Sequence, residues 1–489
     1  MSGISLVDTT LRDGNQSNWG ATGLDTGMML QIAPTMERVG FHAIDFLAST
    51  HMGVAVRFKK EDPWERLRLM RDACPTTPLQ FLTTGMRFIS WEVASEELME
   101  FAFRKLVDNG VRRFAIMDPM NAVPAMLNMA TISRRAGGES NVAALTFTLS
   151  PMHDDAHFAN AARNLAASGQ FDRIYLKDPG GLVTPDRAKT LIPALKAVVG
   201  TTPLEFHSHT TIGLGPFSYL EAAPRGAETL HTSAAGAANG TGQPAMSSVI
   251  SNLRDMGHTV DVDDEAIAQM DAYFTALVDS EGLVHGQPGE FDRAYFRHQM
   301  PGGMMGTMKR QLAEIRSEHL LPRVLAEVER VRAELGYPIM VTPFSQVVGT
   351  QALMNVMQGD RYGTIPDEVT RYVLGRFGQP TMPMDPEIEA RIRNSSRARE
   401  LEDEPHMASL DELRTQIGRG YSDEEFLLRA VMPADQVDAM VAAGPARRDY
   451  NAGSRPIMYL LGELSKRKGL SSIKIEKPGV SLELKGGKE

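Results

Sequence analysis

The chain has 489 residues, 42% of them hydrophobic and 23% charged, so it can bury a large core in two or three domains. Its net charge is -10 and no basic stretch is interleaved with aromatic residues, which argues against nucleic acid as a partner. No apolar run approaches the ~20 residues that span a bilayer, and the single cysteine, Cys74, fits a reducing compartment. We therefore expect a cytoplasmic protein that does not bind membranes.

Short apolar runs recur before residue 240, and most of them end in a polar or charged residue. The runs lie at 5–8, 43–47, 79–83, 114–118, 143–150, 173–177, 204–207 and 228–232. Helical patterns, such as 95–102 and 185–199, lie between them. Eight strand-helix units in ~250 residues predict an α/β fold, a TIM (β/α)8 barrel, with its active site at the carboxyl ends of the strands. An open doubly wound sheet remains the alternative, because periodicity does not reveal closure.

The pattern changes near residue 300, where helical periodicity replaces the strand-helix alternation. One amphipathic helix is expected at 322–335, opened by Pro322. We predict a barrel domain at 1–300, a mostly helical domain at 301–450 that completes an active-site funnel, and a tail at 451–489. Alternating runs at 472–476 and 480–484 predict two strands in the tail, either a hairpin closing on the helical domain or a segment that docks a partner subunit.

Two histidines, His207 and His209, lie two residues apart on a predicted strand. Residues i and i+2 of a strand point to the same face, so both imidazoles can reach one metal ion. An aspartate at the end of another strand can supply a carboxylate. The pattern indicates a divalent-metal site, with two ordinary core or surface histidines as the alternative.

A series of motifs along the chain resembles, in order, those of biotin-dependent carboxyltransferases, the family of the pyruvate carboxylase carboxyltransferase domain and the oxaloacetate decarboxylase alpha subunit. The motifs are Asp8-Thr9-Thr10-Leu11-Arg12-Asp13, Gln16-Ser17, the stretch 61–68, Ser150-Pro151, Lys177-Asp178-Pro179-Gly180-Gly181-Leu182, Gly240-Thr241-Gly242-Gln243-Pro244, Pro301-Gly302-Gly303 and Val341-Thr342-Pro343. The resemblance runs from about residue 5 to residue 440. It implies a metal-dependent, biotin-dependent carboxyltransferase.

The resemblance implies that Asp13, Lys177, His207 and His209 bind a zinc, manganese or cobalt ion. Lys177 would be carbamylated by carbon dioxide, because an ammonium cannot bind a cation and a carbamate oxygen can. A surface pair of Lys177 with Asp178 is the alternative.

Thr342 resembles the residue that moves a proton between substrate and biotin, and its alternative role is to cap a helix before Pro343. Arg12 and Gln16 resemble residues that bind the substrate or the biotin carbonyl, although Arg12 could instead only orient the neighbouring Asp13. A turn between domains is the default role of Pro301-Gly302-Gly303.

The sequence departs from the family where the acceptor substrate would bind. Relatives that use pyruvate carry an arginine after the third strand, and this chain has Thr83 there, with Arg87 nearby but at the wrong spacing. The segment 45–51, beginning with Asp45, replaces a Glu-x-Trp-Gly-Gly-Ala-Thr pattern, and Gln346 replaces a lysine of the biotin pocket. We expect Thr83, Arg87 and Asp45 to contact the acceptor, and pyruvate to be a poor one.

No Ala-Met-Lys-Met biotinylation motif occurs in the sequence, so carboxybiotin is expected from a separate carrier. We predict the carboxyltransferase subunit of a multi-subunit carboxylase. It would assemble with biotin carboxylase and biotin carrier subunits, form a homo-oligomer and carboxylate an enolisable small molecule. The alternatives are a pyruvate carboxylase or oxaloacetate decarboxylase subunit, a biotin-independent lyase of the hydroxymethylglutaryl-CoA lyase type, and a non-catalytic scaffold.

Overall fold

Eight parallel strands close into one barrel in the computed structural model, which describes residues 3–90, 92–404, 408–450, 464, 472–477 and 480–485. The strands follow one another around the barrel in chain order, and β8 pairs with β1 from Ser5–Thr229 to Asp8–Thr232. They are β1 Ser5–Asp8, β2 Ala43–Ala48, β3 Leu79–Leu82, β4 Val111–Met117, β5 Ser140–Thr146, β6 Arg173–Asp178, β7 Leu204–Ser208 and β8 Ala227–Thr232. The predicted barrel is confirmed, and its closure excludes the open sheet.

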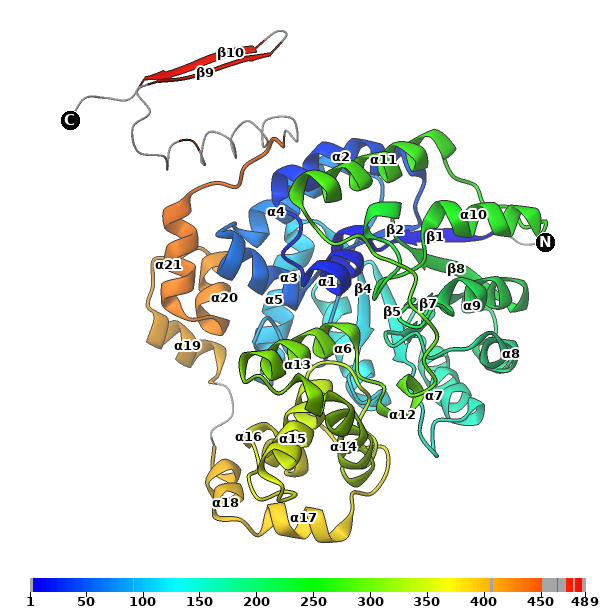
Figure 1. The fold of residues 1–489 in the computed structure, drawn as a ribbon, viewed down its shortest axis with the longest axis vertical. Coiled ribbons are helices and arrows are strands. Elements are labelled where there is room, and N and C mark those ends of the chain that lie inside the picture. Colours follow the sequence, from blue (N-terminus) through cyan, green and yellow to red (C-terminus); the bar gives the residue numbers. More distant parts are fainter. Residues whose placement is uncertain are drawn as a thin grey trace.

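Helices cover the outside of the barrel (Figure 1). The longer ones are α2 Thr26–Val39, α4 Pro63–Ala73, α5 Glu96–Asn109, α6 Val123–Arg135, α7 Asp155–Ala167, α8 Pro185–Val199, α9 Gly215–Ala222, α10 Met246–Asp255 and α11 Asp264–Glu281. Helix α8 begins where expected, because Thr184 accepts a hydrogen bond from the Arg187 amide and Pro185 occupies the first turn. Its buried residues Leu191, Ile192 and Leu195 pack into the core around the strands.

Short helical turns lie at the ends of the strands and in the connections. They are η1 Thr10–Gly14, α1 Asn15–Trp19, α3 Ser49–Val54, η2 Ala55–Lys59, η3 Ala223–Arg225, η4 Ala235–Ala237, α12 Tyr295–His298 and η5 Glu318–Leu320. The turns η1 and α1 directly follow β1 at the mouth of the barrel, the end where the strands have their carboxyl ends.

A second group of helices lies below the barrel in Figure 1 and has its own core. It consists of α13 Gly302–Glu314, α14 Leu321–Glu334, α15 Phe344–Gln358, α16 Asp367–Val373, α17 Pro386–Arg393 and α18 Ser396–Glu402. The predicted helix at 322–335 is α14, with proline in its first turn. Buried Val324, Val328 and Val331 on α14 face Phe344 and Val348 on α15 within that core.

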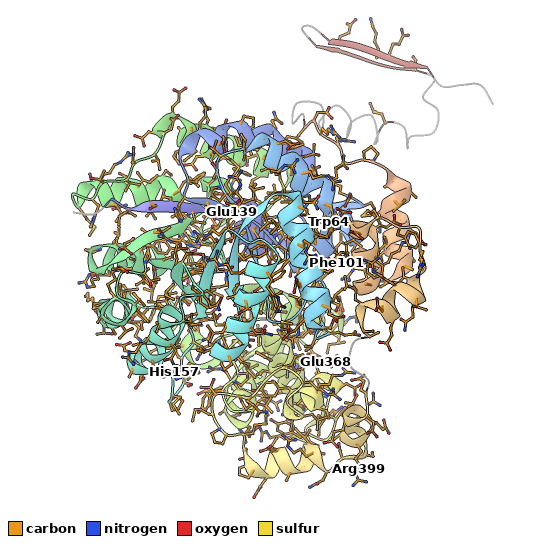
Figure 2. All side chains as sticks on the ribbon, turned by 180° about the vertical axis from the view of Figure 1, so that it is seen from behind. Trp64, Phe101, Glu139, His157, Glu368 and Arg399 are labelled. Carbon is orange, nitrogen blue, oxygen red and sulfur yellow. The ribbon has the colours of Figure 1, made fainter. Side chains whose placement is uncertain are left out.

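The chain then returns to the barrel through α19 Leu410–Ile417, α20 Asp423–Val431 and α21 Ala434–Ala443. Phe426 packs against Phe101 of α5 with ring centroids 6.2 Å apart, and the Trp64 indole donates to the Glu424 carbonyl. Figure 2 labels Trp64 and Phe101 on the side of the barrel that faces these helices. The residues from 410 to 443 therefore share the core of the barrel, an arrangement that the sequence pattern did not indicate.

The two predicted tail strands form an antiparallel hairpin, β9 Ser472–Lys477 and β10 Val480–Lys485, paired from Val480–Lys477 to Lys485–Ser472. Within the described residues these strands pair only with each other. The rest of the predicted docking tail, apart from residue 464, lies outside the described residues. In the described chain, no helix combines the length and the apolar character that a membrane crossing requires.

Candidate active site

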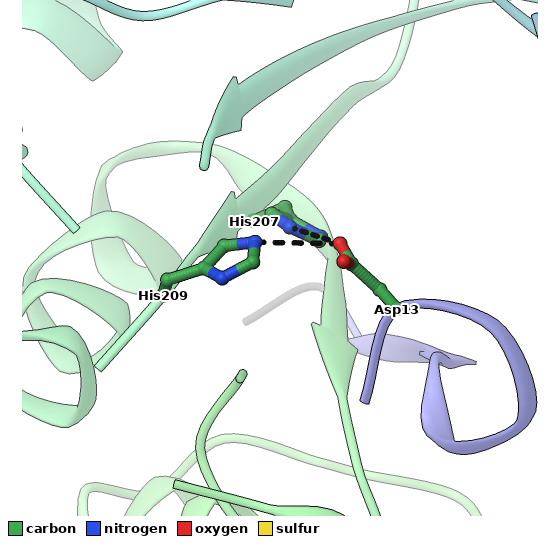
Figure 3. A group of neighbouring side chains, drawn as sticks. All are labelled: Asp13, His207 and His209. Carbon is green, nitrogen blue, oxygen red and sulfur yellow. Dashed lines mark ion pairs between the residues drawn. The ribbon is translucent and has the colours of Figure 1, made fainter. Parts of the chain in front are cut away.

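Three metal-ligating side chains converge at the carboxyl ends of β1 and β7. His207 lies near the end of β7, His209 follows it, and Asp13 lies in η1 after β1. The Asp13 Oδ2 atom is 3.1 Å from His207 Nε2 and 3.3 Å from His209 Nε2. Figure 3 shows both rings directed at the Asp13 carboxylate. All three residues are buried, and their ligand atoms lie within 4.8 Å of one another. These donors suit a divalent metal ion.

Lys177 completes this group from β6, the strand that pairs with β7. It is paired in register with His207, it is 4% exposed, and its Nζ lies 3.5 Å from Asp13 Oδ2. Its neighbour Asp178 accepts hydrogen bonds from the Leu182 and Val183 amides instead. A Lys177–Asp178 surface pair is therefore wrong, since both residues are buried and point to different partners.

The charges of the cluster favour the protonation states that a metal needs. Although burial opposes ionisation, the charges of Arg12 and Lys177 hold the pKa of the Asp13 carboxyl well below its usual range. Burial and the Lys177 charge hold the pKa of His207 well below its usual value. Asp13 is therefore an anion and His207 a neutral imidazole at neutral pH, as metal ligands must be.

Gln243 is a member of the site to which the sequence assigned no role. Its buried amide Nε2 lies 3.2 Å from His207 Nε2 and 3.0 Å from His209 Nε2, while its Oε1 accepts from the Thr9 hydroxyl. The His209 Nδ1 donates to the Thr241 carbonyl at 2.5 Å, which leaves the Nε2 lone pair directed into the cluster. The signal that could have found Gln243 is its position in the Gly240–Pro244 motif, just after β8.

Arg12 connects the cluster to β2. Its Nε and Nη2 donate to Asp45 Oδ2 at 2.8 and 2.5 Å, and Nη2 lies 3.2 Å from Asp13. Burial opposes the charge on Arg12, but the two carboxylates raise its pKa further above its usual value. Arg12 is thus held in place by Asp45 while it contacts the Asp13 carboxylate.

A cavity of about 310 Å³ lies beside the cluster. Predicted site residues on its wall are Arg12, Asp13, Gln16, Lys177, His209 and Thr342. They come from η1, α1, β6, the residue after β7 and the segment before α15, so residues from the barrel and from the second group of helices line one space.

The three residues expected to contact the acceptor, Thr83, Arg87 and Asp45, are not among those that line this cavity. The Thr83 hydroxyl accepts from the Met117 amide at 3.1 Å, and Thr84 occupies the wall. Successive residues of extended chain point to opposite sides, so the neighbouring threonine reaches the cavity. The Arg87 guanidinium lies over the Phe377 ring at 5.2 Å, and Asp45 lies behind Arg12.

Comparisons with known proteins agree with this geometry. A family model described as "Conserved carboxylase domain" matches residues 296–459, and one described as "HMGL-like" matches residues 115–273. The chain is 34% identical over 390 residues to a pyruvate carboxylase subunit of Methanocaldococcus jannaschii, covering 80% of this chain and 68% of that protein. It belongs to the family of biotin-dependent carboxyltransferases.

Two further relatives support that assignment. The 2-oxoglutarate carboxylase large subunit of Hydrogenobacter thermophilus is 30% identical over 448 residues, covering 90% of this chain and 68% of that protein. The carboxyl transferase domain of Rhizobium etli pyruvate carboxylase superposes with a TM-score of 0.81 at 26% identity, covering 91% of this chain and 78% of that one. The chain is therefore an enzyme, a carboxyltransferase subunit of a biotin-dependent carboxylase.

In this carboxyltransferase, Thr342 does not cap a helix. Helix α15 begins at Phe344, its preceding residue is Pro343, and no side chain caps it, so the capping interpretation is wrong. The expected turn at 301–303 is the start of α13, with Gly302 and Gly303 on the cavity wall. A Cβ on Gly302 would lie 2.0 Å from the Thr241 Cγ2 atom, so only glycine fits there.

Proposed function

We propose that this enzyme moves a carboxyl group from carboxybiotin, carried by a separate protein, to an enolisable small molecule. Pyruvate is a poor acceptor in this proposal. The observation that supports this most directly is the convergence of Asp13, His207, His209 and Lys177 beside a cavity that Thr342 also lines. A hydroxyl and a metal site on one cavity suit proton transfer at a carbon next to a carbonyl group.

The four side chains fit a zinc, manganese or cobalt ion, provided that Lys177 is carbamylated. Carbamylation needs the neutral amine, and burial lowers the pKa of Lys177 although the Asp13 charge opposes this. The carbamate would then add an anionic oxygen to two imidazoles and one carboxylate. When bound, such an ion polarises a carbonyl oxygen and stabilises the developing enolate.

The remaining residues bind the reactants and move the proton. Arg12 and Gln16 donate hydrogen bonds to the carbonyl oxygens of the acceptor or of biotin. The N–C bond of carboxybiotin breaks to give carbon dioxide, and Thr342 carries the α-proton of the acceptor to the ureido nitrogen. A carbon–carbon bond then forms between the acceptor's α-carbon and carbon dioxide.

The partners in this proposal are a biotin carboxylase and a biotin carrier, and the enzyme works in the cytoplasm as a homo-oligomer. Our proposed division is a barrel domain at 1–300, a helical domain at 301–450 whose last helices, α19–α21, pack on the barrel, and a tail at 451–489 that docks a partner. Isolated hairpins are marginally stable, so β9–β10 gains from pairing with another chain. Deleting 451–489 should leave the metal content unchanged while the carrier or the biotin carboxylase no longer copurifies. Assembly of the full complex by the truncated chain would exclude docking.

A biotin-independent lyase is the second candidate function, because the "HMGL-like" match covers residues 115–273 of the barrel. A lyase would cleave its substrate without ATP, bicarbonate or a carrier. Lys177 and Thr342 favour carboxyl transfer, since a lyase of this type requires neither a carbamate nor a proton shuttle to biotin.

The purified native complex should incorporate labelled bicarbonate into an enolisable acceptor in the presence of ATP. Lys177→Arg keeps a cation but cannot form a carbamate ligand, so it should abolish incorporation and lower the metal content. Lys189→Arg, at an exposed ion pair with Asp186, is the matched control and should change neither. Full incorporation by Lys177→Arg would contradict the proposed carbamate.

A further inference from the structure

Three apolar side chains line the cavity at the ends of β2, β3 and β4. Ala48, Leu82 and Met117 end these three strands, and Thr50 and Thr84 are the polar residues of the cavity wall that follow β2 and β3. Ala48, Leu82 and Met117 belong to one buried apolar cluster inside the barrel. This wall lies in the same cavity as Asp13 and Lys177, so a molecule held at the metal cluster has its substituents within reach of the wall.

Within the described part of the chain, the arginine and lysine side chains that line the cavity are Arg12 and Lys177. Under the proposed function Lys177 is a carbamate, which leaves Arg12 as the cation of the two. Arg12 donates twice to Asp45 and lies 3.2 Å from Asp13. A carboxylate on the acceptor would have to compete with Asp13 and Asp45 for Arg12.

Arg87 does not replace Arg12. A Cβ on Gly85 would lie 3.1 Å from Arg87 Nη1 and 3.5 Å from Asp118 Oδ2, so that guanidinium lies against the Gly85 backbone and near the Asp118 carboxylate. Its Cζ lies 5.2 Å from the centroid of the Phe377 ring. The charge of Arg87 is therefore directed at Asp118 and Phe377, and Thr50 and Thr84 are the polar residues of this part of the wall.

We propose that the acceptor is a small neutral ketone whose alkyl substituent packs on Ala48, Leu82 and Met117. This proposal rests on the proposed function and names its substrate class. An unpaired carboxylate against such a wall would lose hydration without gaining an ion pair, whereas an alkyl group gains by leaving water. The ketone loses an α-proton, its α-carbon bonds to carbon dioxide, and the product is a 3-oxo acid. The proton passes to biotin as the N–C bond of carboxybiotin breaks.

Exchange of α-protons in D2O tests the proposal without the partner subunits. The metal-loaded full chain with free biotin is incubated with butanone or with pyruvate, and deuterium uptake is followed by NMR. We expect kcat/KM for butanone to exceed that for pyruvate by roughly tenfold or more, the cost of leaving a charged group without its partner. Faster exchange with pyruvate, or no enzyme-dependent exchange with butanone, would overturn the proposal. His207→Ala corrects for exchange caused by free metal.

A matched pair of variants locates the discrimination on the wall. Thr84→Arg places a guanidinium there and should shift the preference toward pyruvate by tenfold or more. Thr84→Val keeps the size without the charge and should retain the preference for butanone. A Thr84→Val chain that prefers pyruvate would overturn the role of the wall. If butanone exchanges but the native complex with ATP incorporates no bicarbonate into it, the proposed carboxyl transfer fails while the substrate class stands.

Discussion

The two ends of the barrel both bury charged groups, and at the carboxyl ends of the strands these groups line a cavity. At the amino ends of the strands, Glu205 of β7 accepts from Arg113 at 2.5 Å, from His231 at 2.9 Å and from Arg173. Arg113 also donates to Gln80 at 2.7 Å. At the carboxyl ends, the side chains of Asp13, His207, His209 and Lys177 converge beside the cavity of about 310 Å³.

This difference separates a structural charge network from a reactive one. At the amino ends of the strands, which form the floor of the barrel, each arginine of this network donates to Glu205 and to a neutral acceptor, so the network ties β3, β4, β6, β7 and β8 together. At the mouth, the ligand atoms of two imidazoles and a carboxylate lie within 4.8 Å of one another, an arrangement that suits a divalent cation. Burial of charge alone therefore does not identify an active site, whereas convergence beside a cavity does.

The largest effect is expected at the mouth. His207→Ala removes one of two imidazoles and should lower the metal content and abolish carboxyl transfer. Metal analysis of the purified chain and bicarbonate incorporation measure the two effects. His285→Ala, on a side chain that is 41% exposed, is the control and should change neither. Retention of both metal and activity by His207→Ala would show that the site is assigned wrongly.

A substitution at the floor should affect stability instead. Arg113→Met leaves Glu205 buried without its principal partner and should cost about 3–5 kcal/mol in the free energy of unfolding. Urea unfolding measures this cost, and metal content per folded chain should stay unchanged. Arg104→Met, which breaks an exposed pair with Glu100, should cost at most about 1 kcal/mol. Loss of metal by folded Arg113→Met would contradict the distinction between a structural network at the amino ends and a metal site at the carboxyl ends.

Asp45→Asn should separate positioning from metal binding at the mouth. The variant replaces the charge-assisted bonds to Arg12 with weaker neutral ones, so kcat/KM should fall roughly tenfold. The metal content should be retained, because Asp45 is not among the converging ligands. Asp186→Asn, on the surface, is the matched control. If the metal content decreased as much as the activity, Asp45 would instead be needed to hold Asp13 in position for metal binding.

The smallest effect concerns the pH dependence of stability. Burial opposes ionisation of Glu205, but Arg113 and His231 hold its pKa well below its usual range. A depressed pKa in the folded state contributes stability that is present above the unfolded pKa of about 4.3 and is lost as pH falls toward the folded pKa. Between about pH 5 and pH 3, the Tm of the metal-free wild type should fall more steeply than that of Glu205→Gln. Equal slopes in calorimetry would contradict this.

Local periodicity was enough to predict the fold class. Alternating apolar runs and helical patterns marked all eight strands, although β5 runs Ser140–Thr146 rather than 143–150. The i, i+2 spacing of His207 and His209 placed both rings on one face, and Lys177 followed from its motif. These features depend on neighbours within one strand, which the sequence carries directly.

Long-range packing determined the rest. Barrel closure requires β1 to pair with β8, more than two hundred residues away, and no periodic pattern encodes that pairing. The side of the chain on which Thr83 and Thr84 lie depends on where β3 ends, which Met117 of β4 fixes through hydrogen bonds. The position of Gln243 beside His207 and the packing of α19–α21 on the barrel core likewise depend on contacts with distant parts of the chain. The sequence by itself thus determined which chemistry the chain carries, and only the tertiary structure decided which residues line the cavity, because that depends on contacts between distant segments.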